Sequence, residues 1–243
     1  MRIALISDIH GNLPALEAVL DAINHQKVDQ VICLGDVCTL GPQPKEVIAR
    51  LRTLQCPCIM GNHESALLNP EAAAKFHIAP PLHPTLQWCA DHLNDQDWEY
   101  LGSFKPSLDL SLGEKTSLFC YHGSPTSNVA NIFSTTPVAE LDNTFNDRTA
   151  TVMAGGHTHL QMLRQHQGTY VINPGSVGSP FKNVPAPDTT PTLLPWAEYA
   201  LVQYDNHQLN IDMHRISFDI RRFKEIISQC DLPIKDWWLQ QYL

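Results

Sequence analysis

The chain has little positive charge and no long apolar run. Its 243 residues include 16 lysines and arginines against 25 aspartates and glutamates, which gives a formal net charge of -9. This balance leaves no basic surface for a long nucleic acid, whose binding depends on counterion release from phosphates. No run approaches the roughly 18 apolar residues of a membrane-spanning helix, and the first residues lack the pattern of a signal peptide. The sequence therefore predicts a cytoplasmic protein with no membrane partner.

Cysteine is present in a number and a setting that disfavour disulfides. The seven cysteines are odd in number and lie mostly within apolar runs, as reduced core thiols do. The Cys56-Pro57-Cys58 pair lacks the two-residue spacing of a zinc knuckle and has no partner pair, so it is not expected to form a separate metal site. For Cys38, two residues after Asp36, we expect packing beside the site rather than metal binding.

A hydrophobic content of 43% suits a chain with a sizeable core, and we expect a single domain over residues 1–243. Short apolar runs at 3–6, 31–34 and 58–60 alternate with helical patterns that begin near Asn12 and Pro44. This alternation predicts βαβ units, a largely parallel sheet, and an α/β fold. Each run ends in a polar turn that contains glycine, and the three turns are expected to meet at the carboxyl edge of the sheet.

The second half of the chain changes to a β pattern. A hairpin is predicted over 108–121, a helix near 137–146, and a buried strand at 151–154. Further antiparallel β segments are expected at 161–166, 169–173, 197–204 and 209–215, before helices at about 219–230 and 234–242. Residues 65–104 form a helical excursion and 178–195 a proline-rich loop. The whole predicts an α/β sandwich of two sheets covered by helices.

Side chains able to ligate a metal follow the predicted strands. Singly, each has a structural explanation: Asp8 and His10 could cap the first helix, and Asn62 could favour a left-handed turn. Together they predict a metal site, because chance does not bring seven such residues to one sheet edge. In an extended turn, residues i and i+2 point to the same side, so Asp8 with His10, and His157 with His159, could each present two ligands. The seven are Asp8, His10, Asp36, Asn62, His122, His157 and His159.

Seven ligands are too many for one ion. Two ions that share a bridging carboxylate would use them all, and Asp36, between the two groups of ligands, is the natural bridge. Two ions about 3.5 to 4 Å apart are the usual machinery for displacement at phosphorus. The sequence therefore predicts phosphoester hydrolysis. The mixed nitrogen and oxygen donors suit Mn, Fe or Zn without choosing among them.

Five motifs carry a resemblance to a known family. In order they are Asp8-x-His10, Gly35-Asp36, Gly61-Asn62-His63-Glu64, His122-Gly123 and Gly156-His157-Thr158-His159. They resemble the five motif blocks of the calcineurin-like metallophosphoesterase superfamily. Residues 8–20, 88–101 and 173–178 are similar to its small bacterial and archaeal phosphodiesterase branch. The resemblance implies a metallophosphoesterase-type αββα sandwich with two mixed sheets flanked by helices.

The resemblance also implies which residues would bind each metal ion and which would act in catalysis. One ion would be bound by Asp8, His10, Asp36 and His159, and the other by Asp36, Asn62, His122 and His157. A hydroxide bridging the ions would attack phosphorus. His63 would be the catalytic residue, giving a proton or hydrogen bond to the leaving oxygen. The alternative is that His63 is only a structural neighbour of the site.

The sequence departs from the phosphoprotein phosphatase branch at one motif. There the Gly-Asp block continues into an Asp-Arg pair, whereas this chain has Thr39 and Leu40. Without the arginine fork, a terminal phosphate dianion is harder to grip. We therefore expect a small phosphodiester or a nucleotide anhydride such as a dinucleoside polyphosphate as substrate. A phosphoprotein or phosphomonoester phosphatase is the alternative, because Glu64 resembles those enzymes.

A non-catalytic scaffold is the rival from another class, since the retromer scaffold subunit resembles this fold. Such chains lose the catalytic histidine, which is present here. In the loop 178–195 and directly after it, Phe181, Lys182 and Trp196 could form a substrate-side rim, or the loop could be plain surface or a dimer contact, which leaves a homo-oligomer open. His77, His83 and His92 are expected to be exposed, unless one of them lines the pocket.

Overall fold

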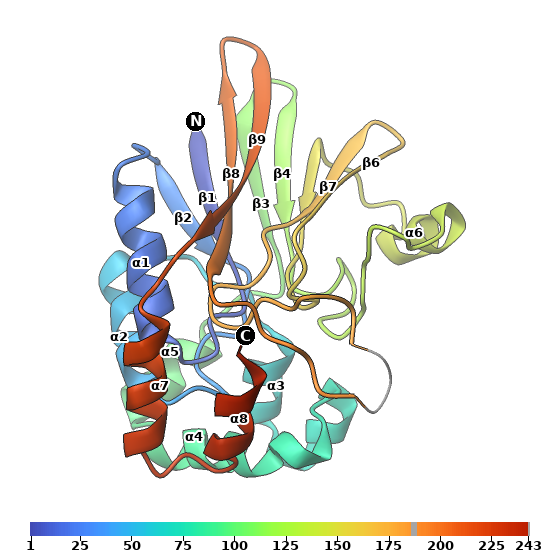
Figure 1. Ribbon diagram of the computed structural model, residues 1–243. Helices are drawn as coiled ribbons and strands as arrows, with labels where there is room; N and C mark the ends of the chain where they lie inside the picture. Colours follow the sequence, from blue (N-terminus) through green and yellow to red (C-terminus); the bar gives the residue numbers. More distant parts are fainter. Residues whose placement is uncertain (186–188, 243) are drawn as a thin grey trace.

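The computed structural model describes residues 1–185 and 189–242 and contains two mixed β-sheets packed face to face (Figure 1). The first sheet has the strand order β2-β1-β8-β9. Its strands are β1 (Arg2–Ile6), β2 (Gln30–Cys33), β8 (Ala197–Asp205) and β9 (Gln208–Ile216). Only β1 and β2 pair in parallel, because the long β8–β9 hairpin adds antiparallel to the other edge of β1. The prediction of a largely parallel sheet was therefore wrong for this sheet, while the two-sheet α/β architecture is confirmed.

The second sheet has the order β3-β4-β5-β7-β6. Its strands are β3 (Leu108–Gly113), β4 (Thr116–Cys120), β5 (Val152–Ala154), β6 (Met162–His166) and β7 (Thr169–Asn173). The three central strands run parallel and each edge is closed by an antiparallel hairpin. The strand expected at 58–60 is reduced to two single bridges, Cys33 to Cys58 and Ile59 to Lys105.

Strand β1 shows why the molecule is layered. Its side chains alternate between two cores: Ala4 and Ile6 pack under the helices, whereas Ile3 and Leu5 pack against the second sheet. All four are completely buried. Because successive side chains of a strand point to opposite faces, a strand that is apolar at every position must be covered on both sides. Burial of each large aliphatic side chain contributes roughly 1.5 to 3 kcal/mol.

Helices α1 (Leu13–Asn24), α2 (Pro44–Leu54) and α7 (Ile220–Gln229) cover the outer side of the first sheet (Figure 1). The predicted start of α1 is confirmed, because the Asn12 side chain accepts a hydrogen bond from the Ala15 N–H at 3.1 Å. Its buried face is Leu16, Val19, Leu20 and Ile23. Helix α6 (Val138–Phe145) packs against the second sheet through Leu141 and Phe145.

The predicted excursion is a string of short helices at the site end of the sheets. They are α3 (Asn62–Leu68), η1 (Pro70–Phe76), η2 (Pro80–Leu82), α4 (His83–His92) and α5 (Asp95–Gly102), with η1 and η2 wound as 3-10 helices. The last helix, α8 (Lys235–Gln241), packs near them, and its residues share an apolar cluster with Leu82 and Trp88. Over the described ranges, no helix has the length and apolar character needed to cross a membrane. All seven cysteines are free thiols, and Cys38 lies in the core with its sulfur 3.8 Å from that of Cys89.

Candidate metal centre

The turns after the strands meet at one edge, as the sequence predicted, but their backbone is not extended. Asp8, His10, Asp36, His157 and His159 all have positive φ angles, between 48° and 68°. The expectation of extended turns was therefore wrong. Left-handed residues turn the chain back sharply, and the turns are joined by hydrogen bonds such as Asp8 N to Gly35 O at 2.9 Å. Non-glycine residues adopt this conformation at a cost, and they do so most often at functional sites.

One group of side chains comes from the first and the last of these turns. The Nε2 atoms of His10 and His159 lie 3.1 Å apart, and Asp8 Oδ1 lies 3.3 Å from His159 Nε2 and 4.0 Å from His10 Nε2. Their ligating atoms are close enough to share one ion. This group is built from residues about 150 positions apart in the sequence, held together by the His157 N–H, which donates to Asp8 Oδ2 at 3.0 Å.

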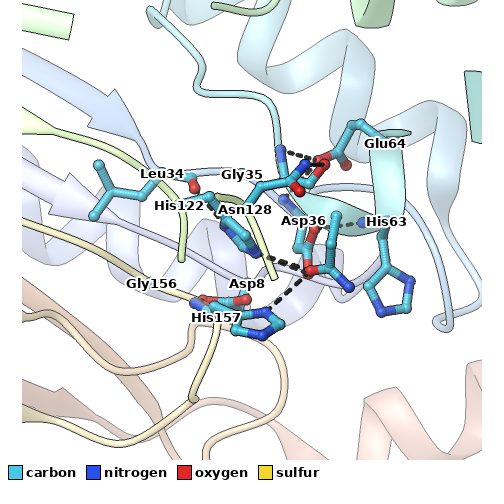
Figure 2. Close-up of polar contacts among 12 residues, drawn as sticks. Asp8, Leu34, Gly35, Asp36, His63, Glu64, His122, Asn128, Gly156 and His157 are labelled. Carbon is cyan, nitrogen blue, oxygen red and sulfur yellow. Dashed lines mark hydrogen bonds and ion pairs between the residues drawn. The ribbon is translucent and has the colours of Figure 1, made fainter. Parts of the chain in front are cut away.

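Figure 2 shows a second group, which includes Asp36, His122 and His157. Asn62 Oδ1 is 3.0 Å from His122 Nε2 and 3.1 Å from His157 Nδ1. His122 Nε2 is also 3.4 Å from Asp36 Oδ2. The ligating atoms of Asp36, His122 and His157 are again close enough to hold one ion.

Asp36 stands between the two groups. Its Oδ2 lies 3.9 Å from His10 Nε2 on one side and 3.4 Å from His122 Nε2 on the other. Its Oδ1 accepts from the His63 N–H at 3.0 Å, which fixes the carboxylate plane. A Cβ on Gly61 would lie 2.1 Å from that same Oδ1, so only glycine lets the two turns approach this closely. The structure therefore brings all seven predicted ligands together, with Asp36 at the centre.

Two histidines are oriented by backbone carbonyls. His122 Nδ1 donates to Leu34 O and His159 Nδ1 donates to Ser179 O, both at 2.7 Å. Since a carbonyl only accepts, each ring carries its proton on Nδ1 and presents Nε2 to the cluster. Metal-ligating histidines are held in this way by a partner on the other ring nitrogen.

The donor atoms fit a cation. Asp8 is fully buried, and its Oδ1 has no hydrogen-bond partner in the described part of the chain. Burial would raise the pKa of the Asp8 carboxyl, but the neighbouring His159 and His122 lower it to about 2. Burial, together with His159, lowers the pKa of His10 to about 3, and burial with His122 lowers that of His157 to about 4. Burial opposes protonation of His122 and His159, but Asp36 raises the pKa of His122 to about 10 and Asp8 raises the pKa of His159. The buried carboxylates thus need positive partners, and metal ions of intermediate hardness take this donor set.

His63 stands beside the two groups, and one of its ring nitrogens is close enough to the ligating atoms of His10 and Asp36 to share an ion with them. Its ring centroid is 5.0 Å from that of His10, and its Nδ1 lies 2.8 Å from Thr39 Oγ1. Burial lowers the pKa of His63, although the charge of Asp36 opposes the shift. Sequence reasoning registered Thr39 only as a missing aspartate and did not foresee this hydrogen bond. The signal was the position of Thr39, three residues after Asp36, where the resemblance places the residue that steers the histidine.

Glu64 holds the turn that carries Asp36. It is fully buried, its Oε1 accepts from the Val37 N–H, and its Oε2 accepts from the Asp36 and Gly61 N–H groups, at 2.8 to 3.1 Å (Figure 2). Burial and the charge of Asp36 raise the pKa of Glu64 to about 8. The sequence linked Glu64 only to the protein phosphatases. In the structure, Glu64 accepts hydrogen bonds from backbone N–H groups.

Removing this acceptor is expected to destabilise the fold. Glu64→Ala would leave three buried N–H groups without a partner, at a cost of about 3 kcal/mol or more. For a chain of this size the loss corresponds to a fall in Tm of about 6 to 12 °C, to be measured by calorimetry on metal-free protein. Glu64→Gln keeps one acceptor oxygen and should lose less. The exposed Glu99→Ala is the matched control, and a Tm for Glu64→Ala equal to that of this control would contradict the structural role.

A cavity of about 580 Å³ opens beside the cluster. Asp36, Asn62, His63 and His157 are among its lining residues. Of the three excursion histidines, His77 lines it. The loop 178–195 contributes Phe181, whose ring packs 4.3 Å from that of His159. The loop therefore forms part of the rim, although the expected contributors Lys182 and Trp196 are not among the described lining residues.

Comparison with known proteins gives the same family. Residues 1–193 match the calcineurin-like phosphoesterase superfamily domain. The chain is 27% identical to an uncharacterised protein, MJ0912, of Methanocaldococcus jannaschii, over 95% of this chain and 93% of that one. It is 28% identical to phosphodiesterase YfcE of Escherichia coli, over 76% of this chain and 84% of that one. A crystal structure of a metallophosphoesterase from Sphaerobacter thermophilus is 26% identical, with a TM-score of 0.74, and covers 99% of this chain and 97% of its own.

The chain therefore belongs to the calcineurin-like metallophosphoesterase superfamily. It is a phosphoesterase with a buried histidine and aspartate cluster that suits metal binding.

Proposed function

We propose that this phosphoesterase hydrolyses phosphodiesters with the help of two metal ions. The observation that carries the proposal is the cavity: among its described lining residues there is no lysine or arginine. Enzymes that grip a phosphomonoester dianion commonly do so with a bidentate arginine. A phosphodiester has a single negative charge and needs no such clamp. Leu40, in the place of that arginine, lines the cavity instead.

The ligand groups support a binuclear centre. Asp8, His10 and His159 would hold one ion, Asn62, His122 and His157 the other, and Asp36 would contribute to both. The place of Asp36 Oδ2 within 4 Å of a histidine from each group favours this bridging role. Mn, Fe and Zn remain the candidates, because all accept mixed nitrogen and oxygen donors. When bound, such a pair lowers the pKa of a water and neutralises charge on the phosphate oxygens.

The protein supplies the remaining steps. His63 would act on the leaving oxygen: in the protonated ring, Nδ1–H donates to Thr39 Oγ1 and Nε2–H remains to donate to the departing group. The hydroxyl of Thr39 keeps the His63 ring oriented with Nε2 free to donate. The position of His63 at the cavity, beside all seven proposed ligands, favours an enzyme over a non-catalytic scaffold. The free, mostly buried thiols favour a reducing, cytoplasmic location.

The proposal predicts faster cleavage of a diester than of a monoester. Metal-stripped protein resupplied with Mn²⁺ is expected to hydrolyse bis-p-nitrophenyl phosphate with a kcat/KM at least about tenfold above that for p-nitrophenyl phosphate, a difference of about 1.4 kcal/mol in transition-state binding. Release of p-nitrophenolate reports both reactions. A dinucleoside polyphosphate, run beside them with product analysis, tests the anhydride alternative.

Two results would contradict this function. Preference for the monoester would favour the phosphomonoester phosphatase. No turnover of any diester, with two metal ions bound per chain, would favour the scaffold. Protein without added metal serves as the blank for non-enzymatic hydrolysis.

A further inference from the structure

The cavity has an apolar side that the proposed chemistry does not use. Besides the ligand cluster it is lined by the 79–82 segment, by Phe181, and by Trp237 and Trp238 of α8. We call Phe181, Trp237 and Trp238 the aromatic wall. These rings come from a loop and from the last helix, far from the metal-binding motifs in the sequence. The wall is therefore a separate feature brought to the same cavity by the fold.

The aromatic wall is held rigidly. Trp238 is 6% exposed and packs in a cluster with Leu40, Leu193 and Phe223. The Leu193 N–H donates to Gln241 O at 2.9 Å, which ties the end of α8 to the loop 178–195. Trp237 is half-buried and meets Trp238 edge to face, with ring centroids 5.0 Å apart. Rings fixed by packing lose little conformational freedom when a ligand binds on them.

The charge of the cavity lining limits which ligand can bind. The absence of lysine and arginine from the described lining means that additional negative charge beyond the metal centre would be uncompensated. A group bound here should thus be uncharged, and flat so that it can lie against the rings.

We propose that the aromatic wall binds a flat, uncharged aromatic substituent of the phosphodiester, an aryl group or a nucleobase, while the phosphate lies at the metal centre. The inference rests on the proposed function, because it places the phosphate at that centre. It assigns Trp237 as the residue that selects the substituent, since this half-buried ring borders the cavity with room beside it. Stacking of a ring on an aromatic side chain favours binding by roughly 10-fold.

The test uses phosphinates, which carry the single negative charge of a phosphodiester and have two P–C bonds that this enzyme cannot hydrolyse, so binding is measured apart from turnover. Calorimetry on Mn²⁺-loaded protein compares dimethylphosphinate, methyl(phenyl)phosphinate and an adenosine analogue that carries a 5′-methylphosphinate group. We expect an aromatic ligand to bind about 10-fold more tightly than dimethylphosphinate. In Trp237→Ala this ratio should fall to about 2-fold, whereas Trp237→Phe, which keeps a flat ring, should retain most of it.

Trp196→Ala is the matched control, because Trp196 is also half-buried but does not line the cavity, and it should keep the wild-type ratio. Preference for methyl(phenyl)phosphinate alone assigns an aryl group, and preference for the adenosine analogue alone assigns a nucleobase. Equal binding of all three ligands by wild-type protein would overturn the inference, as would an unchanged ratio in Trp237→Ala. If the ratio behaves as expected but no diester is hydrolysed, the wall stands and the proposed function fails.

Discussion

Asp36→Asn is expected to impair both metal sites and to lower the kcat/KM for phosphodiester hydrolysis by about three orders of magnitude or more. The reason is the position of Oδ2, within 4 Å of His10 on one side and of His122 on the other. An amide supplies a neutral oxygen and a nitrogen with no lone pair for a metal. Because one side chain serves both groups, loss of its charge should weaken both ions together. Elemental analysis of metal per chain and steady-state kinetics measure the two effects.

Asp212→Asn is the matched control, since it makes the same chemical change on an exposed residue of β9. It should keep wild-type metal content and rate. A thermal melt of each metal-free variant separates loss of ligation from loss of fold. Asp36→Asn protein that holds two metal ions with full affinity would show that Asp36 is not the bridge.

His63→Ala is expected to keep its metal and lose turnover. The His63 side chain touches Thr39 and borders the cavity, and it is not needed to complete either ligand group. Removal of a proton donor at the leaving oxygen lowers kcat by about 10²- to 10⁴-fold. The measurement pairs metal content with kcat for bis-p-nitrophenyl phosphate.

Thr39→Val refines this prediction, because it removes the hydroxyl and keeps the shape of the side chain. It should lower kcat less than His63→Ala and leave the metal content unchanged, whereas Thr39→Ser should restore most of the rate. Full activity in His63→Ala would remove this histidine from the mechanism.

Local patterns explain why much of the fold was predictable. Asn12 marked the start of α1, and short apolar runs that alternate with helical patterns marked β1 and β2 as strands of an α/β fold. The seven predicted ligands lie together because each follows a predicted strand, and the carboxyl ends of neighbouring strands meet. Pairings between distant segments were not predictable in this way. The insertion of β8 beside β1, which makes the first sheet mixed, depends on contacts about 200 residues apart.

The detailed geometry of the site lay beyond sequence reasoning for the same reason. Left-handed φ angles at Asp8 and His10 are imposed by hydrogen bonds from another turn, not by their own residue types. The acceptor role of Glu64 requires three backbone N–H groups from two turns. The aromatic wall joins Phe181 to Trp237 across a stretch with no shared motif. In each case the sequence gives the residue, and only tertiary structure gives its neighbours.

The two ends of the described chain differ in whether a fused tag would disturb the cavity. The Tyr242 hydroxyl is buried and donates to Gly178 O at 2.9 Å, which fastens the residue that follows α8 (Figure 1). Two residues of that helix, Trp237 and Trp238, line the cavity. Met1 precedes β1 and pairs with Tyr204, at the end of the strand away from Asp8. A purification tag or surface tether fused beyond Tyr242 would begin beside the cavity and crowd the substrate entrance. The same tag attached at Met1 would leave the entrance open, so amino-terminal fusions are the ones to use for kinetics.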